Sequence, residues 1–328
     1  MLDIKTNIPL APYTIYKIGG PASFFAEVKT AEELKEALLF AQEKGLPFFI
    51  LGAGSNVLIS DQGVAGLVIH KSGGEVKING DRVVVDAGVM MAKAVLVSAK
   101  AGLTGFEWGV GVPGTIGGSV RGNAGCFGGE MGQVVERVQL LEFSIFNFQF
   151  SNKLQPPSSK FQIRELDSKD CQFGYRDSIF KKHPEWIILS ATLKLKKGDL
   201  LEIQKEVKRI VTERGQKQDI GTKTCGCIFK NVEWAKIGVD KEKLVRDFSE
   251  LAAFIDKPNI PSSFLIDRTG LKGKKIGRVF ISPKHANFFV NEGGASAEEV
   301  RKLIGFAKAE VEKKYGLRLE EEIIYVEF

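Results

Sequence analysis

The spacing of apolar residues along the chain changes between helical and strand periodicity, which predicts a mixed α+β fold. Residues 30–44 carry a capping box of Thr30 and Glu33, followed by apolar side chains at helical spacing, and Gly45 follows as a stop. Helical patterns that each end before a glycine predict three further helices over residues 91–101, 201–214 and 296–315, and Ser296 and Glu299 form a capping box at the start of the last one.

Strand signals surround a short glycine-containing turn in the first part of the chain. The apolar run at residues 47–51 predicts a buried strand, residues 52–56 (GAGSN) predict a tight turn, and residues 57–59 resume the extended pattern. Residues 75–86 alternate in polarity on either side of Asn79-Gly80, a dipeptide suited to a type I′ hairpin. We therefore expect antiparallel strands there, in a different subdomain.

The composition is typical of a globular protein with more than one core. The chain has 328 residues, of which 44% are hydrophobic and 26% are charged, and this length suits two or three domains. No stretch approaches the roughly 20 consecutive apolar residues of a membrane-spanning helix. Residues 1–10 lack the basic start and apolar block of a secretory signal, so we expect a cytoplasmic protein.

The charged residues, cysteines and histidines argue against several classes of function. The formal net charge of +6 is spread in small lysine clusters and forms no basic stripe, which argues against nucleic-acid binding. Four cysteines are too few for a disulfide framework in a chain of this length. Cys225 and Cys227 have no second pair at zinc-binding spacing, and with only three histidines we expect no metal site.

Two segments are rich in glycine, residues 52–55 and residues 105–129 (GFEWGVGVPGTIGGSVRGNAGCFGG). Glycine loses extra conformational entropy on folding, so such runs are favoured where the backbone needs positive φ or a ligand lies against it. Consecutive N–H groups in turns of this kind bind anions, and a diphosphate is one such ligand. Tight turns in a β-rich domain are the alternative interpretation.

Residues 109–114 (GVGVPG) match the dinucleotide-binding pattern G-x-G-x-x-G, and Glu136 lies about 20 residues further on. The context argues against a Rossmann fold, because the preceding residues 91–101 have a helical pattern and Pro113 has no N–H for a pyrophosphate. Residues 151–160 contain two prolines and three serines, which predicts an exposed loop in the β-rich middle of the chain.

Six phrases occur in an order that points to a known family. They are YKIGGPA at residues 16–22, LGAGSNVL at 51–58, GVPGTIGG at 111–118 with NAG at 123–125, FGYRDS at 173–178, GCIFKN at 226–231 and KHANF at 284–288. From about residue 7 to its end, the chain resembles the UDP-N-acetylenolpyruvoylglucosamine reductase (MurB) family.

The resemblance implies a two-part FAD-binding module of the vanillyl-alcohol-oxidase (PCMH) type and a C-terminal α+β substrate domain. Residues 262–291 resemble the subgroup that lacks a tyrosine-bearing insertion. The polar segment after residue 215 marks the most plausible domain boundary. We expect FAD-binding subdomains over residues 1–72 and 73–215, a substrate domain over 216–316 and a C-terminal strand over 317–328.

The resemblance also implies FAD as cofactor and NADPH as co-substrate, with the glycine-rich phrases on the cofactor. The implied cofactor contacts are Gly52, Ala53, Gly54, Ser55, Asn56, Val57, Leu58, Pro113, Gly114, Thr115, Gly117, Gly118, Asn123 and Gly125. The implied contacts to a nucleotide-sugar substrate are Tyr175, Lys230, Asn231 and His285.

The implied reaction reduces UDP-N-acetylglucosamine enolpyruvate to UDP-N-acetylmuramate in peptidoglycan synthesis. Its transition state resembles an enolate, which a pre-placed cation stabilises, and Arg176 matches the catalytic arginine of the family. Glu322 matches the family's C-terminal glutamate, with Glu320 as the competing assignment. Cys227 stands where many members have a proton-donating serine, and a thiol is a stronger acid than an alcohol, so it is able to protonate carbon.

Two other functions remain open from the sequence. A related FAD-dependent oxidase of an alcohol or aldehyde would share the glycine loops, because these report flavin binding and not the substrate. The other is a non-catalytic flavin or nucleotide-sugar binding protein, against which the presence of Arg176 argues. The sequence does not determine the oligomeric state or the preference between NADPH and NADH.

Overall fold

The computed structural model describes residues 2–144, 160–219, 221–236, 238 and 240–327. The loop predicted over residues 151–160 therefore lies outside the described residues, apart from residue 160. The α-helices are α1 Ala31–Glu43, α2 Met91–Lys100, α3 Ile116–Arg121, α4 Met131–Val134, α5 Leu200–Lys217, α6 Lys241–Asp247, α7 Ser262–Arg268 and α8 Ala297–Tyr315. None of these described helices is long and apolar enough to span a bilayer.

The strands group into several sheets. Their bounds are β1 Ile4–Pro9, β2 Pro21–Val28, β3 Phe48–Leu51, β4 Val57–Ile59, β5 Val64–Lys71, β6 Val76–Asn79, β7 Arg82–Asp86, β8 Leu103–Thr104, β9 Gly125–Cys126, β10 Gly129–Glu130, β11 Val135–Ser144, β12 Lys160–Asp167, β13 Trp186–Lys194, β14 Lys196–Lys197, β15 Val232–Glu233, β16 Asn259–Ile260, β17 Lys275–Ile276, β18 Val279–Ile281, β19 Phe289–Asn291 and β20 Ile324–Val326.

The four predicted helices are present, and two begin at the predicted capping boxes. Thr30 and Glu33 cap α1 reciprocally, and Ser296 and Glu299 cap α8 in the same way. The ends of α1 and α2 agree with the prediction to within one residue, whereas α5 continues through Gly215 to residue 217. A glycine inside a helix costs only about 1 kcal/mol, and ion pairs at i,i+4 spacing along this last turn offset part of that cost.

The N-terminal sheet has the order β1-β2-β5-β3, with β5 parallel to both β2 and β3. Helix α1 packs against it through its apolar face, in a core that also contains Leu141 and Phe143 of the next sheet. The parallel pairing of β3 with β5 ends at Leu51, directly before the first glycine-rich loop. The strand predicted to be buried is only partly so, with Leu51 alone fully buried, and the loop is held at its carboxyl end, where open α/β sheets often bind ligands.

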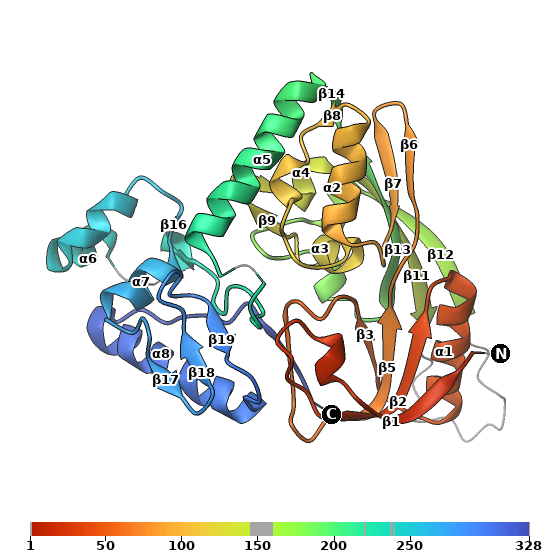
Figure 1. Ribbon diagram of the computed structural model, residues 1–328, viewed down its shortest axis with the longest axis horizontal. Helices are drawn as coiled ribbons and strands as arrows, with labels where there is room; N and C mark the ends of the chain where they lie inside the picture. Colours follow the sequence, from red (N-terminus) through yellow and green to blue (C-terminus); the bar gives the residue numbers. More distant parts are fainter. Residues whose placement is uncertain (1, 145–159, 220, 237, 239, 328) are drawn as a thin grey trace.

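A second, antiparallel sheet has the order β12-β11-β13-β7-β6, and α2, α3 and α5 lie on one side of it (Figure 1). The predicted hairpin at residues 75–86 is confirmed, but its turn differs from the prediction. Asn79 pairs with Arg82, so the two-residue loop is Gly80-Asp81, and in this loop only Gly80 has positive φ. A type I′ turn needs positive φ at both central residues, and positive φ at the first alone is typical of type II′.

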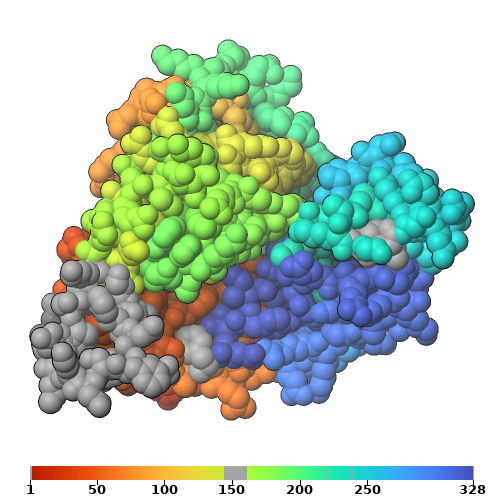
Figure 2. Space-filling view, turned by 180° about the vertical axis from the view of Figure 1, so that it is seen from behind, coloured from red at the N-terminus to blue at the C-terminus, as the bar shows by residue number. Residues whose placement is uncertain are grey.

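The C-terminal lobe contains α6, α7, α8 and the β17-β18-β19 sheet, and it packs against both preceding parts (Figures 1 and 2). Its core includes Tyr16, Ile18 and Leu58 from the N-terminal part of the chain. After α8 the chain returns, and β20 pairs in parallel with β4, which directly follows the first glycine-rich loop. The last residues of the chain are thereby placed beside that loop.

Asp61 fixes the C-terminal lobe to the N-terminal sheet. Its carboxylate accepts hydrogen bonds from the N–H groups of Ala297 and Glu298, at 2.8 and 3.1 Å. These are free N–H groups of the first turn of α8, and a carboxylate there is favoured by the helix dipole. This contact therefore joins the two parts, together with the shared core and the pairing of β20 with β4.

Candidate active site

The two glycine-rich segments meet in the folded chain. A Cβ atom added to Gly52 would lie 2.5 Å from Thr115 Oγ1, and one added to Gly114 would lie 3.1 Å from Ser55 Oγ. Gly54 has a φ of +61°, and a Cβ atom there would lie 2.3 Å from a backbone carbonyl oxygen. A side chain at residue 52 or 54 would therefore collide with protein, and the two loops form one continuous surface.

The first loop presents unused hydrogen-bond donors. The backbone N–H groups of residues 52–56 donate to no acceptor among the residues that the structure describes. Such a row of N–H groups requires water or a ligand, and a diphosphate supplies several acceptor oxygens at once. The loop thus fits the diphosphate of the cofactor predicted for residues 52–58.

Arg176 lies at a strained turn. Gly174 and Asp177 exchange two backbone hydrogen bonds of 3.0 and 3.1 Å, so Tyr175 and Arg176 occupy the tip of this turn. Arg176 has a φ of +54°, in the left-handed region, which costs a non-glycine residue roughly 1–3 kcal/mol. In this conformation the guanidinium reaches the second glycine-rich segment, where Nη2 donates to the Gly125 carbonyl at 2.7 Å.

Arg176 and Glu322 form a half-buried ion pair. Arg176 Nε donates to Glu322 Oε1 at 2.8 Å, across 146 residues of sequence. Burial raises the pKa of the Glu322 carboxyl, while Arg176 acts in the opposite direction. Nη1 of Arg176 has no hydrogen-bond partner among the described residues, so one edge of the guanidinium is free for an anionic ligand.

The structure separates the two glutamates between which the sequence left a choice. The Glu322 side chain is 19% exposed and faces Arg176, whereas that of Glu320 is 66% exposed and pairs with Lys230. Strand alternation does not relate the two, because β20 begins only at Ile324. The geometry therefore favours Glu322 as the carboxylate of the site.

Replacing each glutamate by glutamine tests this choice. We expect Glu322→Gln to slow the oxidation of reduced flavin by the nucleotide-sugar substrate about 10- to 100-fold. The glutamine amide next to Arg176 carries no negative charge and cannot be protonated and deprotonated as a carboxyl group can. Glu320→Gln, the matched control, should change this rate less than about threefold, since only an exposed ion pair is lost. Stopped-flow absorbance at the flavin band measures both rates. Equal effects of the two changes would remove Glu322 from the site.

Cys227 lies next to the ion pair. Its neighbour Ile228 accepts a hydrogen bond of 2.7 Å from the Glu322 N–H and donates one of 2.9 Å to the Asn287 carbonyl. Burial first, and then the charge of Glu322, raise the pKa of the Cys227 thiol to about 12, although Arg176 and Arg214 oppose the shift. The thiol is therefore protonated at neutral pH, as a proton donor must be.

The raised pKa predicts slow alkylation of Cys227. At pH 8 we expect iodoacetamide to react roughly 1,000-fold more slowly than with a free thiol of pKa about 8.5, because the thiolate is the reactive form. The rate should rise about tenfold per pH unit through pH 10. Mass spectrometry of the peptide that carries Cys227 measures it, and a plateau below pH 10 would contradict the raised pKa.

Three of the predicted substrate contacts form one group. The N–H of Asn231 donates to Tyr175 Oη at 3.1 Å, and the Tyr175 ring lies 5.3 Å from the Arg176 guanidinium carbon. Lys230 follows Cys227 by three residues and pairs with Glu320. His285 is placed less decisively: its Nδ1 is buried without a hydrogen-bond partner among the described residues, and its ring packs on Phe288.

Several predicted cofactor contacts have their groups engaged within the protein. Asn123 is fully buried, and its amide donates to the Gly174 carbonyl and accepts from the Gly132 N–H, both at 2.8 Å. It therefore joins the second glycine-rich segment to the turn of Arg176. A Cβ atom on Gly117 would lie 2.9 Å from that of Ala87, so this glycine is required by packing. Of the remaining residues, Val57 and Leu58 are buried in β4.

Comparison with known proteins identifies the family. Residues 216–326 match the UDP-N-acetylenolpyruvoylglucosamine reductase C-terminal domain, and residues 22–143 match an FAD binding domain. The UDP-N-acetylenolpyruvoylglucosamine reductase of Synechococcus sp. (strain JA-3-3Ab) is 35% identical over 98% of this chain and 90% of its own length. The chain belongs to the UDP-N-acetylenolpyruvoylglucosamine reductase family.

Other members of this reductase family are similar over the same length. The protein of that name from Clostridioides difficile (strain 630) is 33% identical over 98% of this chain and 92% of its own. The crystal structure of the Thermus caldophilus enzyme superposes with a TM-score of 0.73 at 30% identity and covers 99% of both chains. The predicted family, the α+β fold class and the FAD-binding module are confirmed, whereas the exact domain boundaries stay predictions.

Two cations near the site of this reductase were missed by the sequence analysis. Arg214 is buried at the end of α5, its Nη1 lies 3.4 Å from Cys126 Sγ, and its Nε has no partner among the described residues. A signal was present, because Arg214 continues the apolar stripe of Ile203 and Ile210. Lys181 donates to the Arg176 carbonyl and so supports the strained turn. Nothing in its local sequence indicates this.

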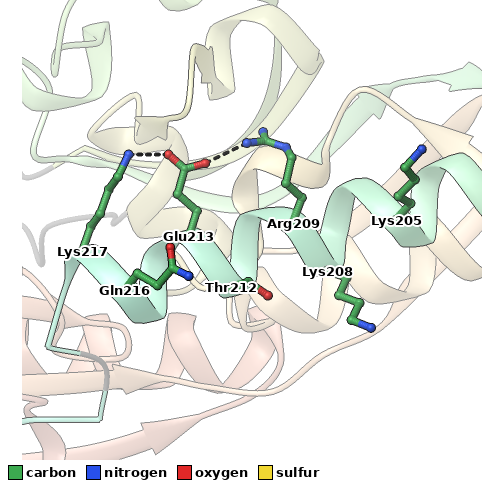
Figure 3. Close-up of a pocket in the computed structure, with 7 residues that line it drawn as sticks. All are labelled: Lys205, Lys208, Arg209, Thr212, Glu213, Gln216 and Lys217. Atoms are coloured by element: carbon green, nitrogen blue, oxygen red, sulfur yellow. Dashed lines mark hydrogen bonds and ion pairs between the residues drawn. The ribbon is translucent and has the colours of Figure 1, made fainter.

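The hollow in Figure 3 is no part of this site. All seven of its lining residues come from α5, and they face solvent along one side of that helix. Two of its four cations, Arg209 and Lys217, pair with Glu213. A second hollow, which contains Lys230, Asn231 and Glu320, adjoins the predicted substrate contacts. The described residues contain no cluster that could hold a metal ion.

Proposed function

We propose that this chain reduces UDP-N-acetylglucosamine enolpyruvate to UDP-N-acetylmuramate, with FAD as bound cofactor and NADPH as the reductant. The observation that carries the proposal is the Arg176–Glu322 pair, which lies against a glycine-rich surface suited to a diphosphate. Proteins named for this reaction match the chain over almost its full length. The chain is an FAD-dependent oxidoreductase of the peptidoglycan pathway.

The cofactor would be held by the loop at residues 52–56 and by residues 113–118 of the second segment. Bound FAD supplies the transfer of two electrons and a proton, as hydride, from NADPH to the substrate. The protein supplies the surroundings for this transfer. Backbone N–H groups of the first loop would donate hydrogen bonds to the diphosphate oxygens, and Gly114, Thr115 and Ser55 close the surface between the loops.

The catalytic work of the protein is to stabilise negative charge and to deliver one proton. The guanidinium of Arg176 holds the substrate carboxylate and the enolate charge that develops beside it. Glu322 orients Arg176, and its raised pKa allows it to donate a hydrogen bond when protonated. Cys227 Sγ delivers its proton to the enolate carbon, and solvent then restores the thiol. Tyr175, Lys230 and Asn231 position the nucleotide sugar.

The purified protein offers a direct test. It should be yellow, with flavin absorbance, and it should oxidise NADPH only when UDP-N-acetylglucosamine enolpyruvate is present. Gly54→Ala is the matched negative variant, because a Cβ atom at this positive φ collides with the backbone oxygen of Tyr13, against which the cofactor loop packs. Oxygen consumption driven by an alcohol or aldehyde would favour an oxidase. Flavin that binds without any turnover would favour a binding protein.

A cytoplasmic location stays a prediction, and so does the absence of a nucleic-acid partner. The proposed substrate is an anionic nucleotide sugar, which agrees with the positive formal charge of the chain and with the half-buried cations near the site.

A further inference from the structure

Asn56, the last residue of the first glycine-rich loop, makes two hydrogen bonds to the segment that carries Glu322. Its side-chain Nδ2 donates to the Glu322 carbonyl at 3.0 Å, across 266 residues of sequence. Its own carbonyl accepts from the Ile324 N–H, also at 3.0 Å. A residue that the sequence placed on the cofactor therefore uses its side chain on the backbone of the catalytic segment.

The backbone of Glu322 is held from two sides. Its N–H donates to the Ile228 carbonyl at 2.7 Å, next to Cys227, and its carbonyl receives the Asn56 amide. Residues 320–323 form no regular strand. On the N-terminal side of Glu322 an isolated bridge between Glu321 and Phe229 fixes the backbone, and on the C-terminal side the Asn56 amide does so. The Glu322 carboxylate then reaches Arg176 at 2.8 Å.

Each member of the ion pair is thus tied to a different glycine-rich loop. Glu322 is tied to the first loop through Asn56, and Arg176 is tied to the second through the Gly125 carbonyl. We infer that Asn56 is a positioning residue, which couples occupancy of the cofactor loop to the placement of Glu322 opposite Arg176. The inference rests on the proposed function for its kinetic consequence, but the coupling itself is a property of the chain.

The expected effect of losing this contact is selective. A displacement of about 1 Å at a reacting group lowers a rate by on the order of 100-fold, whereas the binding of cofactor through other backbone groups is unaffected. Removal of the Asn56 amide should therefore slow the step that uses Glu322. Flavin reduction by NADPH, which does not need the substrate-side carboxylate, should continue.

The test is Asn56→Leu, which keeps a similar volume and removes the donor, with Asn56→Gln as the conservative variant. For Asn56→Leu we expect the FAD dissociation constant, from fluorescence quenching, and the rate of flavin reduction by NADPH to change less than about threefold. Stopped-flow reoxidation by the substrate should fall about 10- to 100-fold at saturating substrate, and Asn56→Gln should restore part of it. Asn79→Leu, at an exposed hairpin position, is the control and should leave both steps unchanged.

A second readout needs no substrate. In the wild-type protein, FAD binding should slow hydrogen exchange of the backbone amides of residues 322–324, and this protection should be lost in Asn56→Leu. If reoxidation and protection are both unchanged in the variant, Asn56 is not a positioning residue. If FAD affinity falls while reoxidation at saturating FAD is normal, Asn56 is a cofactor ligand and the inference fails. If the wild-type flavin is not reoxidised by the substrate, the proposed function fails, and hydrogen exchange still decides the role of Asn56.

Discussion

Cys227→Ala slows the reoxidation of reduced flavin by UDP-N-acetylglucosamine enolpyruvate by an expected factor of about 100 to 10,000, while flavin reduction by NADPH proceeds normally. The factor is the range that a positioned general acid contributes. The thiol lies beside Glu322 and Arg176 and is protonated because burial raises its pKa to about 12. Single-turnover stopped-flow measurements of the two half-reactions check the expectation.

Serine and a second cysteine provide the controls for this change. Cys227→Ser should recover much of the rate, because a hydroxyl at the same position also donates a proton to the enolate carbon. Cys171→Ala makes the same substitution at a buried cysteine of another core and should leave both half-reactions unchanged at a temperature where the protein is folded. Normal turnover by the alanine variant would exclude Cys227 as the donor.

Arg176→Lys lowers kcat/KM by an expected factor of about 100 to 1,000, which corresponds to about 2.7–4 kcal/mol of transition-state stabilisation. Lysine keeps the charge but has no planar fork, so it cannot at once pair with Glu322, donate to the Gly125 carbonyl and hold a substrate carboxylate. Steady-state NADPH oxidation at varied substrate concentration measures the loss.

The control variant for Arg176→Lys is Arg137→Lys. Arg137 is an exposed arginine with ion pairs to Glu165 and Asp167, and its replacement should leave kcat/KM within a factor of two. Arg176→Ala should be at least as slow as Arg176→Lys, because it also leaves the Glu322 carboxyl half-buried without its partner. An unchanged kcat/KM in Arg176→Lys would mean that the planar guanidinium of Arg176 contributes nothing to the reaction beyond its charge.

Local sequence determined those elements whose signals lie within a few residues of one another. The caps of α1 and α8, the strand–turn–strand at residues 48–59 and the hairpin at residues 76–86 were all predicted, because capping, periodicity and glycine conformation are short-range properties. The same short-range phrases identified the family and the residues Arg176 and Cys227. The end of α5 was missed, because its side-chain ion pairs offset the glycine that predicted its stop.

The tertiary structure alone decided which of these residues act together. Glu322 was separated from Glu320 by its contact with Arg176, 146 residues away, and Arg214 and Asn56 were placed by packing between elements far apart in sequence. Such contacts depend on the parallel pairing of β20 with β4 and on the capping of α8 by Asp61. A single sequence records which chemical groups are present, but the distance between two of them is set by the packing of whole elements, and no local pattern encodes it.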